Sequence, residues 1–247
     1  MKTTVKWNNV WLLFLSQALF QTASILVITL SGVVGLQMAA DKNLATLPIA
    51  MITVGTASMM IPASIILKKI GQRKGFMLGT IIGVLSGLVS WYGIIQQSFW
   101  IFSVGNMLLG AYQGFTQYYR FAAADAVPDA AKSKAISFVI AAGVIAAFAG
   151  PNLAKFTQHL GAVPYAYSYF SIILLSILAF GVVSLLKLQK PFNLPTNGTA
   201  KKGRPLKEII KNKDTILALL SSATAFVVMG MAMTTTPIAM HGFGHPS

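Results

Sequence analysis

Six long stretches of this 247-residue chain contain no Asp, Glu, Lys or Arg. They are residues 7–40, 43–67, 75–119, 135–154, 156–186 and 215–247. About 18 consecutive apolar residues are enough for a helix that spans the hydrocarbon core of a bilayer. Only 10% of the residues are charged, whereas a soluble domain has about 25%. The runs therefore predict an all-α, polytopic membrane protein and exclude a soluble fold.

The longest uncharged run, 75–119, is too long for a single span. As one helix it would reach about 68 Å at about 1.5 Å per residue, against a hydrocarbon core of about 30 Å. Its polar break, Gln96-Gln97-Ser98, has aromatic residues on both sides and predicts a turn at the membrane surface. The predicted helices are 10–38, 44–67, 75–95, 99–120, 133–157, 165–187 and 215–238. We therefore expect a six-helix bundle followed by one additional transmembrane helix.

The basic residues divide unevenly between the two sides of this predicted topology. If the N-terminus is cytoplasmic, every Lys and Arg except Lys42 and Lys155 lies in a cytoplasmic segment. Lys and Arg resist translocation and gather on that side of the membrane. We therefore expect a multi-pass protein of the cell (inner or plasma) membrane with a cytoplasmic N-terminus, in which residues 67–75 form a short cytoplasmic loop. The net charge of +14 then reflects topology, and no nucleic-acid partner is expected.

A basic segment separates the last predicted helix from the others. Residues 189–214 are rich in Lys, Pro and Gly, a composition typical of linkers. We therefore predict three parts: an N-terminal six-helix transmembrane bundle over 1–188, a basic cytoplasmic linker over 189–214, and a seventh transmembrane helix within 215–247.

Uncharged polar side chains gather on one face of two predicted helices. Helical spacing groups Gln17, Gln21 and Ser24 in the first helix, and Asn106, Gln113 and Gln117 in the fourth. An amide that faced lipid would leave polar groups unsatisfied at a cost of several kcal/mol, so both faces should point inward. Two interpretations are open: hydrogen bonds between helices, worth about 0.6 kcal/mol each, or a water-filled substrate path, which amides on both helices favour.

Two glycine patterns predict features of helix packing. Gly75, Gly79, Gly83 and Gly87 recur at four-residue intervals, which predicts close approach of a neighbouring helix. Gly150-Pro151 predicts a kink in the fifth helix, because proline removes a backbone hydrogen bond.

No catalytic or metal-binding constellation can be assembled within the predicted spans. All five acidic residues lie in loops or at helix ends, and the chain has no Cys. We therefore expect no enzymatic activity, no cofactor and no metal site. Because no ionisable group lies in the middle of a span, a neutral or amphipathic solute is favoured over a strongly charged one.

The basic stretch between the second and third helices contains a partial motif. Its positions are Ser64, Lys68, Lys69, Gly71, Gln72 and Arg73. Together with six helices and a long linker, it resembles the N-terminal half of a major facilitator superfamily transporter, whose loop signature is Gly-x-x-x-Asp-Arg/Lys-x-Gly-Arg/Lys-Arg/Lys. Lys69, Gly71 and Arg73 match this signature. The family's Asp, which helps to latch its cytoplasmic gate, is replaced by Lys68.

The resemblance implies a bundle of 3+3 helical repeats and secondary transport of a small solute by alternating access. It implies a gating region that comprises Lys68, Lys69, Gly71, Arg73, Arg120 and Asp125. We expect Asp125 and Asp129 to substitute in part for the missing Asp by pairing with Lys68, Lys69, Arg73 and Lys74. The family has twelve helices, so the chain looks like a transporter cut short, in which case copies could associate with one another. The expected partners are the lipid bilayer and an unknown small-molecule substrate. The alternative is a non-transporting membrane remnant or an interaction subunit.

Overall fold

The computed structural model describes residues 7–187, 212, 215–218, 220–225 and 227–228. The chain divides into two compact units, Met1–Phe192 and Asn193–Ser247. In the second unit, the described residues from 215 onward are helical, and the rest of the predicted seventh helix lies outside the described residues. So does nearly all of the predicted linker, 189–214. The paragraphs below concern the first unit.

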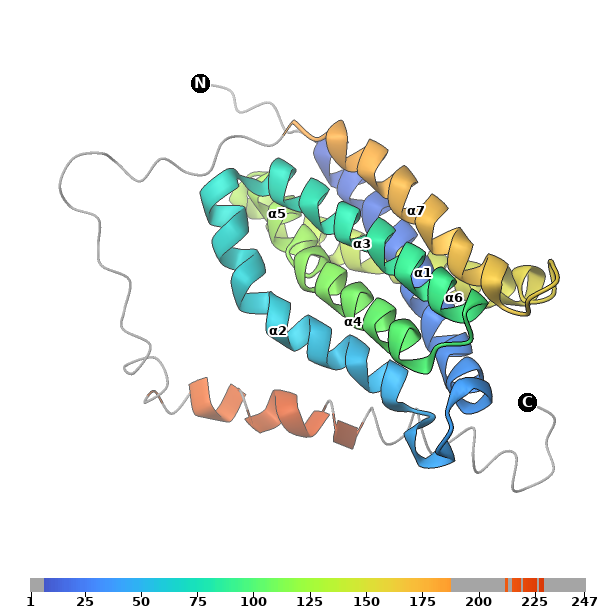
Figure 1. The fold of residues 1–247 in the computed structure, drawn as a ribbon. Helices are drawn as coiled ribbons and strands as arrows, with labels where there is room; N and C mark the ends of the chain where they lie inside the picture. Colours follow the sequence, from blue (N-terminus) through green and yellow to red (C-terminus); the bar gives the residue numbers. More distant parts are fainter. Residues whose placement is uncertain (1–6, 188–211, 213–214, 219, 226, 229–247) are drawn as a thin grey trace. The chain divides into compact units, whose positions relative to one another are not determined.

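Every regular element that the structure describes in this unit is helical (Figure 1). The α-helices are α1 (Trp7–Met38), α2 (Leu47–Ile70), α3 (Gln72–Ile95), α4 (Phe99–Thr116), α5 (Tyr119–Asp125), α6 (Lys132–Thr157) and α7 (Ala166–Ser184). Two short 3₁₀-helices, η1 (Lys42–Leu44) and η2 (Asp129–Ala131), precede α2 and α6. The all-α prediction is confirmed. Among the described residues, five segments are long and apolar enough to cross a membrane: α1, η1 with α2, α3, η2 with α6, and α7.

The predicted fourth helix, 99–120, is wrong in its extent. Helix α4 ends at Thr116 and a separate helix, α5, begins at Tyr119. Between them Tyr118 N donates to Phe115 O, at 3.1 Å. This bond reaches back three residues, whereas an α-helical bond reaches back four. The hydroxyl of Tyr118 donates to the Met60 carbonyl of α2, at 2.9 Å. A contact with another helix therefore accompanies the break, and a local sequence pattern does not reveal such a contact.

The predicted loop over 67–75 is reduced to a single residue. Helix α2 continues to Ile70, and α3 begins at Gln72. Gly71 joins them with φ 87° and ψ 157°, a conformation that essentially only glycine adopts. The basic residues of this stretch therefore lie on two helix ends that meet at one sharp turn.

The glycine stripe of α3 faces α4 and α7, as the sequence predicts. A methyl group added at Gly79 would lie 2.8 Å from the side chain of Phe115 in α4. One added at Gly87 would lie 2.7 Å from the side chain of Ile173 in α7. The absence of side chains at these positions lets three helices pack together.

The long helices form two three-helix groups, α1, α2 and α3, and then α4, α6 and α7. The middle helix of each group packs on the first helix of the other group. Helix α2 packs on α4, α6 packs on α1, and α3 packs on α7. Gly55 of α2 meets the backbone of Met107, and Gly110 of α4 meets the backbone of Ile52. This exchange agrees with the 3+3 repeats that the resemblance implies.

Gly150 takes part in the packing of α6 on α1. A methyl group added there would lie 2.8 Å from Ile25 Cγ2. Helix α6 continues through Pro151 to Thr157, and the kink at Gly150-Pro151 stays a prediction.

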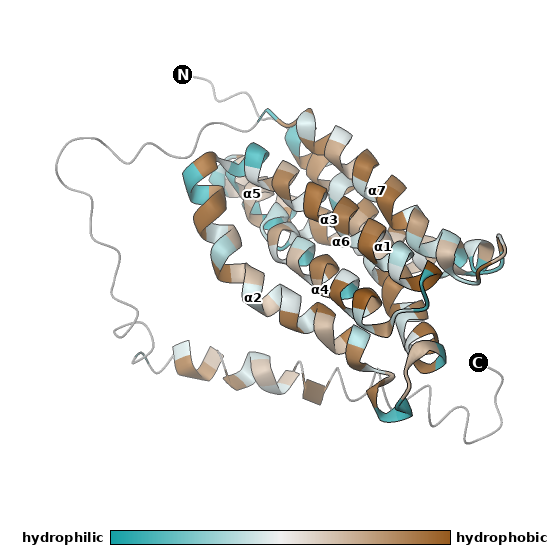
Figure 2. Cartoon of the chain, viewed as in Figure 1, coloured by the Kyte–Doolittle hydropathy of each residue, from teal (hydrophilic) through white to brown (hydrophobic). Residues whose placement is uncertain are grey.

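Hydrophobic residues predominate along the helices, and hydrophilic residues gather near the helix ends (Figure 2). Phe148 and Phe156 of α6 and Ile61 of α2 are each more than 70% exposed. Large exposed apolar surfaces are rare on soluble monomers, whereas lipid tails cover them readily. The exposed side chains are therefore those that a bilayer would contact.

Candidate substrate cavity

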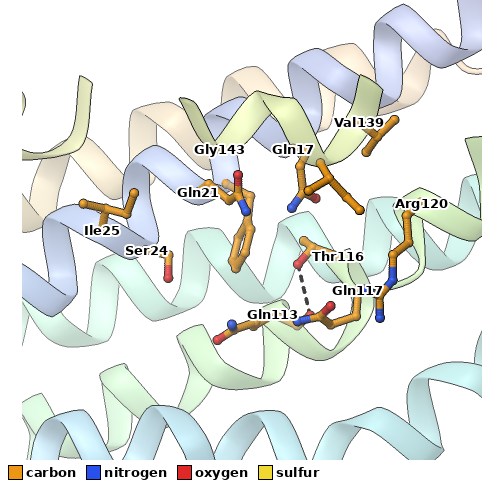
Figure 3. Close-up of a pocket in the computed structure, with 12 residues that line it drawn as sticks. Gln17, Gln21, Ser24, Ile25, Gln113, Thr116, Gln117, Arg120, Val139 and Gly143 are labelled. Carbon is orange, nitrogen blue, oxygen red and sulfur yellow. Dashed lines mark hydrogen bonds between the residues drawn. The ribbon is translucent and has the colours of Figure 1, made fainter. Parts of the chain in front are cut away.

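A cavity of about 420 Å³ lies between α1, the α4–α5 segment and α6 (Figure 3). Sites for small molecules usually measure about 300–1,000 Å³. Its lining residues are Gln17, Phe20, Gln21, Ser24 and Ile25 of α1, Gln113, Thr116, Gln117 and Arg120 of the α4–α5 segment, and Val139, Ile140 and Gly143 of α6.

Five of the six polar residues that the sequence assigns to a substrate path line this one cavity. They are Gln17, Gln21, Ser24, Gln113 and Gln117. Helical spacing aligns them along α1 and the α4–α5 segment. The packing of α6 against α1 adds a third wall, which the amide pattern did not indicate.

Asn106, the sixth residue, lies elsewhere. It is 1% exposed, and its Oδ1 accepts a hydrogen bond from Ser31 Oγ at 3.1 Å. Ser31 Oγ also lies 2.8 Å from the hydroxyl of Tyr169. These contacts join α1, α4 and α7. At this position the structure agrees with the interpretation as hydrogen bonding between helices rather than with a path.

Several polar atoms of the cavity lining are buried without a protein partner. Gln17 Oε1, Gln21 Oε1 and Arg120 Nε have no hydrogen bond within the described part of the chain. Leaving such an atom unsatisfied costs about 1–3 kcal/mol. All three atoms are closed to solvent in this conformation, so the side chains have to shift before water or a solute can pair with them. Gln113 Oε1, in contrast, lies 3.1 Å from Thr56 Oγ1 of α2, which holds that side chain in place.

Arg120 is a cavity residue that the sequence reasoning placed in the gating region instead. It is the one ionisable side chain among the twelve lining residues. Its guanidinium stays charged, and its Cζ lies 5.0 Å from the centre of the Phe121 ring. The spacing of Gln113, Gln117 and Arg120 continues the amide face of the fourth predicted helix, and this signal was available in the sequence. Arg120 lies at the end of the predicted fourth helix rather than in its middle, and the structure adds it to the cavity lining.

Residues 11–247 match the sequence profile of the Major Facilitator Superfamily. This chain belongs to the Major Facilitator Superfamily. The riboflavin transporter RfnT of Brucella anthropi is 35% identical to it over 243 residues, which cover 98% of this chain and 61% of the transporter.

Two further superfamily relatives are the uncharacterized MFS-type transporters YdeG and YddS of Bacillus subtilis. They are 25% and 26% identical to this chain over 234 residues. The match covers 88% of this chain and 54% and 53% of the two relatives. The chain thus spans little more than half the length of these two and less than two thirds of RfnT. No solved structure matches it.

The superfamily's loop signature falls at the α2–α3 turn. Lys68 and Lys69 lie in the last turn of α2 and Arg73 in the first turn of α3, on either side of Gly71. This turn contacts the end of α5, because Gln72 Nε2 donates to Asp125 Oδ2 at 3.0 Å.

The expected ion pairs of Asp125 and Asp129 with the basic residues of the turn are not formed in the described part of the chain. Within the described residues, the one salt bridge joins Lys132 Nζ to Asp129 Oδ1 at 2.7 Å. Helix α3 begins directly after Gly71, which brings the Gln72 side chain against α5. The link between the two segments is therefore a neutral amide on a carboxylate.

Proposed function

We propose that this chain forms part of a secondary transporter, that its cavity is this half's contribution to the solute path, and that riboflavin is the solute. The observation that carries the proposal is the convergence of six uncharged polar side chains and Arg120 on one cavity. The relation to a riboflavin transporter supports the choice of solute. Family membership points to a multi-pass transporter of the membrane rather than to an enzyme.

The chemistry of the cavity suits such a solute. Riboflavin is uncharged at neutral pH, and it combines a flat aromatic ring with a pyrimidinedione edge and a hydroxyl-rich side chain. Phe20, Ile25 and Ile140 supply apolar surface for the ring. Gln17 and Gln21 line the cavity, and once their buried oxygens turn toward it, they can accept hydrogen bonds from the hydroxyl groups or from the ring N–H.

Alternating access would open this cavity to each side of the membrane in turn. In the proposed topology the N-terminus is cytoplasmic, and the α2–α3 turn and α5 form part of the cytoplasmic gate. The hydrogen bond between Gln72 and Asp125 would replace the ion pair of the family's latch. Lys68, Lys69 and Arg73 flank that contact.

A binding measurement on the purified chain in lipid nanodiscs tests the proposal. Quenching of riboflavin fluorescence should saturate with added protein. A methyl group at Gly143 would lie 3.0 Å from Gln21 Oε1, so Gly143→Leu should fill the cavity and weaken binding at least tenfold. Gly181→Leu is the matched control, because nothing lies within 4 Å of a Cβ added at Gly181. Equal binding by both variants would contradict the proposed site.

Transport is tested in the organism that carries the gene. Deleting the gene that encodes this chain should lower the uptake or the release of radiolabelled riboflavin by intact cells. Gly143→Leu introduced at the chromosomal copy should reproduce the deletion, and Gly181→Leu should not. Unchanged flux in the deletion strain would overturn riboflavin as the solute.

A further inference from the structure

The charge of the cavity is concentrated at one end. Arg120 and Gln117 lie together near Gln17, whereas Ser24 and Ile25 line the opposite end (Figure 3). Gln17 and Ile25 are separated by about 12 Å along α1, at about 1.5 Å per residue. The cavity therefore distinguishes the two ends of a solute about as long as a three-ring molecule.

Arg120 faces this cavity without a carboxylate. None of the twelve lining residues is acidic, and within the described residues Arg120 forms no salt bridge. The nearest acid along its helix, Asp125, accepts a hydrogen bond from Gln72. The guanidinium is therefore available to an acceptor that enters the cavity.

We propose that Arg120 binds the oxygen-rich edge of the transported solute and so sets its orientation. For a flavin, this edge is the pyrimidinedione, whose carbonyl oxygens point away from the apolar dimethylbenzene end. The assignment rests on the proposed function, which supplies the class of solute. It adds the contact by which the cavity would distinguish one solute of that class from another.

The geometry of guanidinium suits this contact. Arginine presents several N–H donors in one plane, and a carbonyl beside a ring nitrogen offers neighbouring acceptors in one plane. The Phe121 ring, 5.0 Å from Arg120 Cζ, supports the guanidinium by a cation–π contact. Arg120 Nε is itself buried, so contact with an acceptor in the cavity falls to the two terminal nitrogens of the guanidinium.

Three variants test the assignment by riboflavin fluorescence titration in nanodiscs. Arg120→Gln should weaken riboflavin binding about tenfold or more, because hydrogen bonds to charged groups are the stronger ones. Arg120→Lys keeps the positive charge but loses the planar set of N–H donors, and it should bind riboflavin with intermediate affinity. Lys74→Gln is the charge-matched control, since Lys74 is exposed at the start of α3, and it should bind as the unaltered chain does.

A modified flavin separates direct contact from a structural effect. In 2-thioriboflavin one carbonyl oxygen of the dione is replaced by sulfur, a weak acceptor. The unaltered chain should prefer riboflavin over 2-thioriboflavin several-fold in a competition titration, and Arg120→Gln should lose that preference. Equal losses of affinity for both ligands in Arg120→Gln, or no loss for either, would overturn the assignment. Failure of the unaltered chain to bind riboflavin would instead overturn the proposed function, and the assignment with it.

Discussion

Two amides on one face of α4 have different surroundings, although they are only seven residues apart. Asn106 is buried and hydrogen-bonded to Ser31, whereas Gln113 lines the cavity. The amide face of α4 therefore serves packing toward one end of the helix and the cavity toward the other. A helical wheel cannot separate the two roles, because it contains no information about depth.

Cysteine accessibility separates these roles. The chain contains no Cys, so single substitutions have no background. Gln21→Cys and Gln113→Cys should react with a water-soluble maleimide, because their side chains line the cavity. Asn106→Cys should be protected, and Leu109→Cys, which is 1% exposed, is the buried control. Reaction at Asn106 as fast as at Gln113 would show that the path reaches the Ser31 contact.

The contact between α2 and α4 depends on the absence of a side chain at Gly110. A Cβ there would overlap the backbone of Ile52 and lie 2.9 Å from Thr56 N. Since backbone cannot yield as a flexible side chain does, Gly110→Ala should lower the free energy of unfolding by about 1–3 kcal/mol. Thermal unfolding in detergent measures the loss. Gly181→Ala, at an open position, should be neutral or slightly stabilising, and an equal effect of both changes would contradict this account.

At the scale of the elements, the helix boundaries depend on a few residues with special backbone conformations. Gly71 and Gln97 both have positive φ, 87° and 51°, and each ends a long helix. Ser98 N donates to Gly93 O at 2.9 Å and Gln97 N to Ile94 O at 3.1 Å, which is the hydrogen-bond pattern of a Schellman cap. The predicted break at Gln96-Gln97-Ser98 is therefore confirmed and has a backbone cause.

The one-residue turn at Gly71 should not tolerate a side chain. Its φ of 87° and ψ of 157° lie in a region that costs other residues about 1–3 kcal/mol. Gly71→Ala should destabilise the purified protein by about this amount and loosen the contact between Gln72 and Asp125. Thermal unfolding, compared again with Gly181→Ala, provides the measurement. A variant as stable as the control would mean that the turn adopts another conformation in the membrane.

At the scale of the whole first unit, basic residues gather at one end of the helix bundle. The α2–α3 turn and α5 lie at the same end of the bundle as the start of α1 (Figure 1). Asn9 at the start of α1 and Lys187 after α7 exchange two hydrogen bonds of 3.1 Å. The basic residues of these segments therefore belong to one side of the bundle, which is the arrangement that a cytoplasmic N-terminus requires.

Reporter fusions test this orientation. Fusions after Lys74 and Lys134 should report a cytoplasmic location, because Lys and Arg accumulate on that side. A fusion at Gln97, in the turn between α3 and α4, should report an external one. A cytoplasmic signal at Gln97 would contradict both the orientation and the crossing of α3 and α4.

The sequence by itself determined that this chain is a bundle of membrane helices, and it located most of their ends. The reason is that a bilayer offers no hydrogen bonds to the backbone, so long uncharged runs have to be helical. It also identified the packing face of α3, because Gly79 and Gly87 recur at helical spacing. It identified five of the twelve residues that line the cavity, because polar side chains have to avoid lipid.

Only the tertiary structure decided which of these polar groups share a space. Arg120 lines the cavity together with Val139 and Gly143 of α6, because α6 packs against both α1 and α5. Asn106 is withdrawn from it because Ser31 and Tyr169 lie opposite. Asp125 meets Gln72 rather than a basic residue of the α2–α3 turn. Each of these outcomes depends on which neighbour stands across from a side chain, and that is set by helix packing over long sequence separations rather than by local periodicity.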